Sequence, residues 1–212
     1  MSDPQNPVAE PAYKDRTFRS PAGIAGGALL LALGAWLGID AVIRGEGRTP
    51  WLALAGLLLA VPLVVAFTVR PAVYANDDRL RVRNPFRTVT LPWASIATLR
   101  SSYSNEAVTT SGAKYQLWAI PVSLRGRKKA ARRQSQAAAA GDPVTGGRPF
   151  LDPSAKPTRS EGDQVMDELR ELSERQADAE TAQGEPTVRW AYEIVVPSLA
   201  GAILLAVLLA VT

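Results

Sequence analysis

The chain of 212 residues contains no cysteine and no histidine. Without cysteine, the protein has no disulfide, no thiolate nucleophile and no cysteine metal site. Without histidine, it also lacks the commonest general base and the commonest metal ligand. These two absences exclude most hydrolase triads and most zinc sites. We therefore expect no catalytic, cofactor-binding or metal-ligating residues.

The sequence motifs of nucleotide and ester chemistry are missing as well. It contains no P-loop pattern, no G-x-G-x-x-G and no G-x-S-x-G. Carboxylates and serines remain as reactive groups, which leaves an enzyme as an alternative. The acidic residues cluster on the polar side of a predicted helix without the signature of a pocket. A non-catalytic protein without a cofactor is the better interpretation.

Long runs without charge are the main positive feature of the sequence. The mean hydropathy of the whole chain, −0.01, is that of an ordinary soluble domain. That average conceals three stretches without any charged residue, at positions 22–39, 51–69 and 194–211. Each approaches the roughly 20 apolar residues that cross about 30 Å of hydrocarbon. We expect a transmembrane hairpin over residues 21–69 and a third transmembrane helix over residues 190–211.

Basic residues near the ends of these spans predict their orientation. The N-terminal tail holds three, the loop between the first two spans holds two, and residues 70–87 hold five. Because cytoplasmic loops carry an excess of Lys and Arg, we place the loop outside the cell. The tail, expected to be disordered over residues 1–20, and the segment after the second span then lie in the cytoplasm. The C-terminus lies outside.

A cleaved signal peptide is the alternative interpretation of the first apolar stretch. Its apolar run is longer than a usual h-region of 7–15 residues, and a second span follows after a short loop. We therefore expect a multi-pass protein of the cell membrane.

The segment between the second and third spans changes charge along its length. Residues 70–133 contain 13 basic and 3 acidic residues, whereas residues 134–193 contain 6 basic and 12 acidic residues. In the first part, short alternating runs separated by turn residues predict five or six antiparallel strands. We expect a strand meander over residues 70–122, with a hairpin across Ser111 and Gly112.

The acidic part contains one amphipathic helix, predicted over residues 160–182. Its apolar side chains recur at helical spacing and include Val165, Met166, Leu169 and Leu172. This stripe is expected to pack on the open face of the sheet, because a lone meander cannot bury both faces. Residues 123–159 are rich in Ala, Gly and Pro and in basic residues, and they predict a disordered linker.

Two segments resemble the bacterial PH-like domains. They are Tyr74-Ala-Asn-Asp-Asp-Arg-Leu-Arg-Val-Arg-Asn-Pro-Phe-Arg87 and Leu91-Pro-Trp-Ala-Ser-Ile96. In particular, the chain is similar to the group related to the actinobacterial low-molecular-weight protein antigen 6. Those proteins are small membrane proteins in which a helical hairpin precedes the PH-like domain. The resemblance covers residues 22–120, and the linker and the third span depart from it.

The resemblance implies the fold class but identifies no ligand. The expected architecture combines membrane helices with an α+β domain. An N-terminal transmembrane helical hairpin precedes a PH-like antiparallel sheet with one amphipathic helix, and a third transmembrane helix closes the chain.

Two basic clusters are candidate sites for an anionic surface. Arg79, Arg81 and Arg83 alternate on one face of a predicted strand, where they would bind lipid head groups or form a solvated face near the membrane. The second cluster would form one stripe if its segment were helical, and it would attract anionic lipid or nucleic acid equally, without sequence readout. Its members are Arg125, Lys128, Lys129, Arg132 and Arg133. The alternative for this second cluster is a flexible cytoplasmic loop whose positive charge only sets the orientation.

Two tryptophans, Trp93 and Trp118, would form either a ligand platform or part of a small core, and the core is the commoner outcome.

Taken together, the sequence predicts a membrane-tethered binding or scaffolding module. Its expected partners are the bilayer, a protein or peptide, and in the alternative anionic lipid head groups, with no specific nucleic acid.

Overall fold

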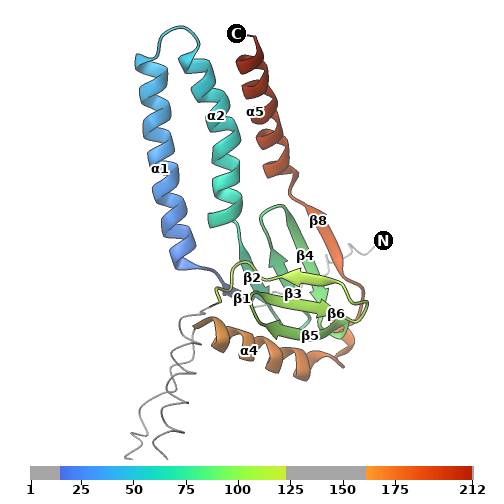
Figure 1. Cartoon of the computed structure of the whole chain (residues 1–212). Helices are drawn as coiled ribbons and strands as arrows, with labels where there is room; N and C mark the ends of the chain where they lie inside the picture. Colours follow the sequence, from blue (N-terminus) through green and yellow to red (C-terminus); the bar gives the residue numbers. More distant parts are fainter. Residues whose placement is uncertain (1–14, 123–160, 212) are drawn as a thin grey trace, which may run out of the picture.

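The computed structural model describes residues 15–122 and 161–211, and in these ranges three apolar helices stand on one end of a mixed domain (Figure 1). The helices are α1 (Pro21–Arg44), α2 (Thr49–Val64) with the π-helical turn η1 (Val65–Val69), α4 (Glu161–Gln176) and α5 (Tyr192–Ala210), with 3-10 turns η2 (Trp93–Ser95) and η3 (Glu180–Ala182). The strands are β1 (Arg16–Phe18), β2 (Ala72–Ala75), β3 (Arg79–Arg83), β4 (Arg87–Pro92), β5 (Ile96–Ser101), β6 (Asn105–Thr109), β7 (Lys114–Gln116) and β8 (Thr187–Trp190). The predicted fold class is confirmed: membrane-length helices flank a PH-like antiparallel sheet region with one amphipathic helix.

The strands form two antiparallel sheets. One has five strands in the order β1-β2-β3-β4-β8, and the other has three in the order β5-β6-β7. The predicted hairpin between β6 and β7 is confirmed, because the amide of Thr109 donates to the carbonyl of Ala113 at 2.9 Å. Gly112 supplies the positive φ of 83° that this turn requires. Short alternating runs were therefore sufficient to predict β2 to β7.

Both edge strands of the larger sheet differ from the prediction. Residues 16–18, expected to belong to a disordered tail, form β1 and pair with β2. Residues 187–190, of which the last was assigned to the third span, form β8 and pair with β4. β1 and β8 are as short as β7 and β2, but their partners lie far away in the sequence, so no turn signal connects them to the sheet. The larger sheet is thus assembled from three separate parts of the chain.

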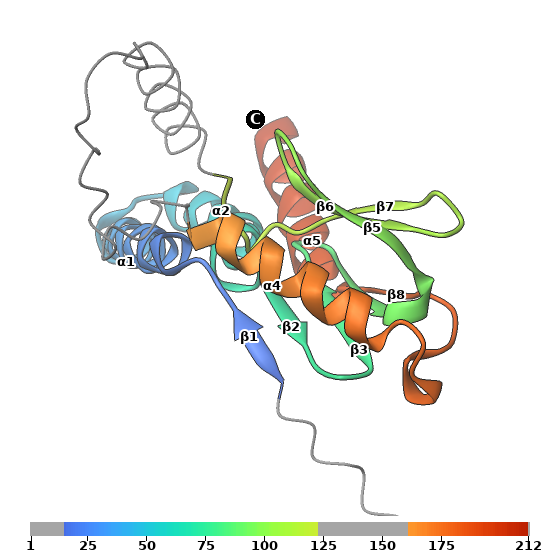
Figure 2. The same ribbon diagram turned by 90° about the horizontal axis from the view of Figure 1, so that it is seen from below.

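The core lies between the two sheets and α4. Side chains on the inner face of the larger sheet, such as Val73, Leu80 and Val89, are fully buried in it. The predicted helical stripe is confirmed, because Met166 and Leu169 are buried in the same core. Helix α4 lies at the end of the domain away from the membrane helices (Figure 1), across the gap between the sheets (Figure 2).

The observed amphipathic helix is shorter than the helix predicted over residues 160–182. Helix α4 ends at Gln176, and a separate 3-10 turn, η3, occupies Glu180–Ala182. Arg16 of β1 forms an ion pair with Glu168 of α4, which ties the edge strand to the helix. The predicted linker over residues 123–159 lies outside the described residues.

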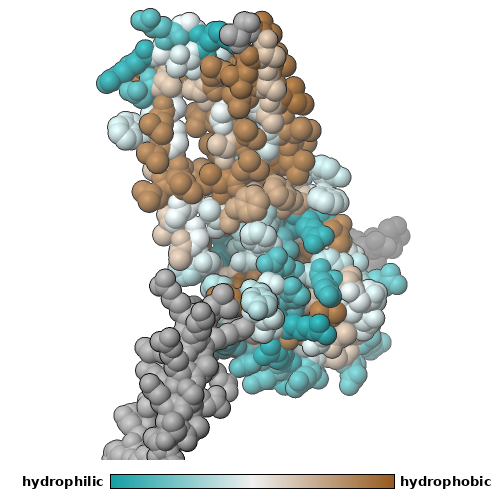
Figure 3. All heavy atoms as spheres, viewed as in Figure 1, coloured by the Kyte–Doolittle hydropathy of each residue, from teal (hydrophilic) through white to brown (hydrophobic). Residues whose placement is uncertain are grey.

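Three helices are long and apolar enough to cross a membrane, in agreement with the three predicted spans. They are Pro21–Arg44, Thr49–Val69 and Tyr192–Ala210. Figure 3 shows a hydrophobic surface over these helices and a mostly hydrophilic surface over the domain below them. β1 precedes the transmembrane hairpin, β2 follows it, and the two strands pair. Both ends of the transmembrane hairpin therefore lie on the domain side, and α5 ends at the far end of the bundle (Figure 1).

Helix α2 is the centre of the bundle, with α1 and α5 on either side of it (Figure 1). Small residues let the backbones approach closely. A Cβ added at Gly201 of α5 would lie 2.4 Å from the backbone nitrogen of Leu59 in α2. The backbone cannot yield as a flexible side chain would, so this position admits glycine alone at the observed helix separation.

We predict that Gly201→Ala destabilises the bundle, because the new methyl group forces α5 away from α2. Overpacking of this kind typically costs roughly 1–3 kcal/mol. The measurement is the thermal unfolding midpoint of the full-length protein in detergent. Gly56→Ala is the matched control, since a Cβ at Gly56 meets nothing within 4 Å. Equal midpoints for the two variants would contradict the close α2–α5 contact.

Candidate binding surface at the membrane junction

The outer face of the five-stranded sheet is polar and rich in arginine. Strand register places Tyr74, Arg81, Thr90 and Thr187 in one row across β2, β3, β4 and β8. The next row toward the membrane contains Arg83, Thr88 and Arg189 on β3, β4 and β8. The second sheet and α4 lie on the opposite, apolar face. We call this surface the arginine face.

The sequence prediction that Arg79, Arg81 and Arg83 share one face of a strand is confirmed. All three lie on β3, opposite the buried Leu80 and Val82. The second predicted basic cluster, at positions 125, 128, 129, 132 and 133, lies outside the described residues. The candidate surface is therefore built on β3 and its neighbours.

Tyr74 is the centre of the first part of the arginine face. Its hydroxyl accepts hydrogen bonds from Arg19 Nη2 at 3.0 Å and from Arg83 Nη1 at 3.4 Å. The guanidinium of Arg81 stacks over the ring, 4.7 Å from its centroid, and also donates to Asp15 Oδ2 at 3.3 Å. Three cations thus surround one phenol, with one carboxylate beside them.

The electrostatic result is a shift in the pKa of Tyr74. Partial burial raises the pKa of the phenol, but the hydrogen bonds and charges of Arg83 and Arg19 outweigh it and bring the pKa below the ordinary value of 10.0. The surface therefore stabilises a negative charge placed on it. Neighbouring cations favour the charged form of an acidic group at this position.

A cavity of about 350 Å³ opens in the second part of the arginine face, next to the start of α5. It is lined by Arg70, Arg81, Arg83, Thr88, Thr90, Arg189, Trp190 and Glu193. Four arginines and one glutamate give it a formal charge of +3. Its lining comes from β3, β4, β8 and the two chain segments where the sheet meets α2 and α5.

Arg70 is the one lining arginine whose side chain is almost completely buried, at 7% exposed. It donates from Nε to the carbonyl of Asn84 at 3.2 Å, from Nη1 to Glu193 Oε1 at 2.6 Å and from Nη2 to Thr88 Oγ1 at 3.4 Å. With all three nitrogens engaged, Arg70 forms the fixed wall of the cavity.

The two tryptophans have different roles, and the prediction that both belong to the core is correct for one of them. Trp93 is fully buried, and its Nε1 donates to the carbonyl of Asn76 at 2.8 Å. Trp118 remains 46% exposed and contacts Phe67 of η1 edge to face, with the ring centroids 5.6 Å apart. Because Trp118 packs against the base of a membrane span, it lies at the membrane interface, where tryptophan is favoured.

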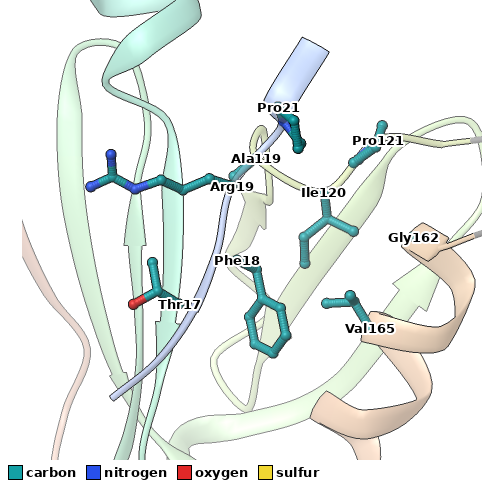
Figure 4. Close-up of a pocket in the computed structure, with 9 residues that line it drawn as sticks. All are labelled: Thr17, Phe18, Arg19, Pro21, Ala119, Ile120, Pro121, Gly162 and Val165. Atoms are coloured by element: carbon teal, nitrogen blue, oxygen red, sulfur yellow. The ribbon is translucent and has the colours of Figure 1, made fainter. Parts of the chain in front are cut away.

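A second, smaller pocket of about 120 Å³ lies between β1, α4 and residues 119–121 (Figure 4). Figure 4 shows the side chains of Phe18, Ile120 and Val165 gathered in it, while Arg19 extends away. Its lining is mostly apolar and continuous with the core, because Phe18 and Val165 pack against the core residues. We interpret this pocket as a packing gap beside the core.

The arginine face offers hydrogen-bond donors of positive charge. Among the described residues, no group of three or more Asp or Glu side chains is placed to hold a metal ion. The available groups are guanidinium and hydroxyl donors, which suit phosphate and carboxylate ligands. Among the residues that line the cavity, Glu193 is the one carboxylate, and it is already bonded to Arg70.

Arg19, Arg70 and Arg189 of this face are not among the site residues that the sequence predicts. Arg19 lies in the segment expected to be a disordered tail, and Arg189 directly precedes the residues predicted to form the third span. Both reach the face because β1 and β8 add to the sheet edges. Alternation within β3 was the only available signal, and it could not reveal partners from distant strands.

We predict that Tyr74 deprotonates below pH 10 in the folded protein. The phenolate absorbance near 295 nm of the wild type minus that of Tyr74→Phe measures its titration. Arg83→Gln should move this titration to higher pH, since one stabilising cation is lost. Because the folded-state pKa is the lower one, the contribution of Tyr74 to stability is present above the unfolded-state pKa and lost as the pH falls through the folded-state pKa. An unchanged titration in Arg83→Gln would contradict the assigned contact.

One segment of this chain, residues 70–143, matches a family model. The comparisons with curated proteins and with solved structures found no match. The matched segment contains β2 to β7, so β1, α4 and β8 complete the domain outside it. Residues 70–143 of this chain match the model of the bacterial PH domain family.

Proposed function

We propose that this protein is a non-catalytic, membrane-anchored binding module that presents a PH-like domain at the cytoplasmic surface. The observation that carries the proposal is the arginine face. Its side chains are exposed or half-buried, while the opposite face of the same sheet is buried in the core. A row of cations kept out of the core, beside three membrane helices, is suited to binding a negatively charged partner.

Membrane anchoring makes a weak contact sufficient. A partner at the same membrane meets the domain at a raised effective concentration, so that each contact needs little affinity of its own. We propose a protein or peptide with acidic groups as the partner of this surface. The similarity of residues 91–96 to the antigen 6-related group supports a place in that group.

The distribution of basic residues supports the proposed cytoplasmic placement. Arg19, Arg70 and Arg189 each lie within a few residues of a membrane helix on the domain side. The loop at the other end of the hairpin has only Arg44 and Arg48, and Arg44 is paired with Asp40. The positive-inside rule then puts the domain in the cytoplasm and the C-terminus outside.

We predict that a reporter inserted after Ala140 shows a cytoplasmic location. β-Galactosidase at this point should be active, and alkaline phosphatase, which requires export, should be inactive. The same pair fused after Thr212 should give the reverse result. An active alkaline phosphatase after Ala140 would overturn the proposed orientation.

A second prediction concerns the surface itself. A photo-cross-linking amino acid at Thr187, which is exposed on the arginine face, should give a discrete cross-linked product in membranes. The same group at Glu174, exposed on α4, is the matched control and should give none. Arg81→Glu should remove the product at position 187, because the charge of the face is reversed there. Equal products at both positions would refute a role for the arginine face.

Recognition of anionic lipid is the second candidate function. A specific observation favours it: the lining of the cavity in the arginine face includes Arg70, directly after η1, Arg189, near the end of β8 that leads into α5, and Glu193, in the first turn of α5. A ligand in this cavity would therefore lie at the membrane surface.

A further inference from the structure

We propose that the cavity between β3, β4, β8 and the start of α5 binds the phosphate group of an anionic membrane lipid. This inference rests on the second candidate function, recognition of anionic lipid, since it names a ligand for the arginine face. It goes further by assigning the ligand chemistry to one cavity and to particular side chains.

The position of the cavity selects a ligand at membrane level. Arg189 and Trp190 end β8, and α5 begins two residues later at Tyr192. Arg70 follows directly after η1, at the end of the second span. The cavity therefore lies where the apolar helices meet the polar domain, which is the depth of lipid head groups. Trp190, 57% exposed, has the amphipathic ring that favours this depth.

The cations of the cavity are not equally available. Arg70 has all its nitrogens engaged, and Arg81 is bonded to Asp15. Arg83 donates a hydrogen bond to the hydroxyl of Tyr74 at 3.4 Å, and the Glu193 carboxylate, which is hydrogen-bonded to Arg70, also interacts with its charge. Within residues 15–122 and 161–211, Arg189 has no ion pair. Arg83 and Arg189 are thus the two guanidinium groups left for an added anion.

Strand register brings these two arginines to the same place. Arg83 pairs with Thr88 on β4, and Thr88 pairs with Arg189 on β8. Neighbouring strands are about 4.8 Å apart, so the two arginines flank one threonine at roughly 10 Å from backbone to backbone. Their long side chains can converge from that separation on a single phosphate. Guanidinium groups bind phosphate oxygens through paired N–H donors.

Thr88 supplies a further donor between the arginines. Its Oγ1 accepts from Arg70 Nη2, which leaves the hydroxyl proton to donate to a ligand. The cavity volume of about 350 Å³ is within the range of small-ligand sites. A phosphodiester with its head group would fit there while its acyl chains remained beside α5. Two cations, one hydroxyl and a membrane-level opening together specify a lipid phosphate.

The test uses the full-length protein in a neutral detergent, with bound ligand counted by native mass spectrometry. Three ligands are compared: phosphatidylglycerol, phosphatidylcholine and inorganic phosphate. The wild type should retain phosphatidylglycerol in preference to phosphatidylcholine, and inorganic phosphate at the same concentration should not displace it. Arg83→Gln and Arg189→Gln should each lower the apparent affinity for phosphatidylglycerol about tenfold.

Arg79→Gln is the matched control, since Arg79 lies at the opposite end of β3 from Arg83, outside both the cavity and the two rows that define the arginine face. It should keep the affinity of the wild type. Arg189→Lys preserves the positive charge but not the paired N–H donors of the guanidinium group. It should therefore lose less affinity for phosphatidylglycerol than Arg189→Gln. The thermal unfolding midpoint of each variant, measured in the same detergent, separates loss of binding from loss of folding.

Three results would overturn the proposal. Equal losses in Arg79→Gln and Arg83→Gln would show a diffuse charge effect in place of a site. Equal retention of phosphatidylcholine would exclude selection for an anion. Displacement by inorganic phosphate would assign the cavity to a free phosphate. If any of these occurs while the Thr187 cross-link persists, this inference fails and the proposed function stands. If the cross-link is absent as well, both fail.

Discussion

The contacts of Arg70 join the membrane bundle to the domain, and the other features described above depend on this junction. One nearly buried guanidinium reaches the β3–β4 turn through Asn84, strand β4 through Thr88 and helix α5 through Glu193. A buried cation is costly unless it is paired and fully hydrogen-bonded, and here every nitrogen has a partner. Because the partners come from three segments, the charge is satisfied only when the sheet, the second span and the third span are together.

This junction explains why the arginine face lies where it does. Each membrane helix is joined to the larger sheet by a short connection: β1 leads into α1, η1 leads into β2, and β8 leads into α5. The sheet therefore cannot move far from the bilayer, and its outer face remains near the lipid surface. Trp118 and Phe86 also pack edge to face against Phe67, near the end of the second span. These contacts fix further parts of the domain at the same membrane level.

Sequence reasoning succeeded where a signal repeats within one element. The apolar spans, the alternation of β3 and the stripe of α4 each repeat several times, and each was predicted correctly. It failed where the evidence is a contact between distant segments. β1 and β8 pair with strands that lie far from them in the sequence, and Trp118 differs from Trp93 through its packing against η1. The cavity combines residues from β3, β4, β8 and α5, so its existence could not be read from any single stretch.

The division of the larger sheet among three parts of the chain also governs the order of its assembly. During synthesis, β1 emerges before the hairpin and cannot find its partner β2 until both spans have been made. The opposite edge is completed by β8, just before the last span. Contacts between such distant segments form slowly, since a long loop must close first. Membrane insertion brings β1 and β2 closer together, because the two spans return the chain to the side of the bilayer on which β1 lies.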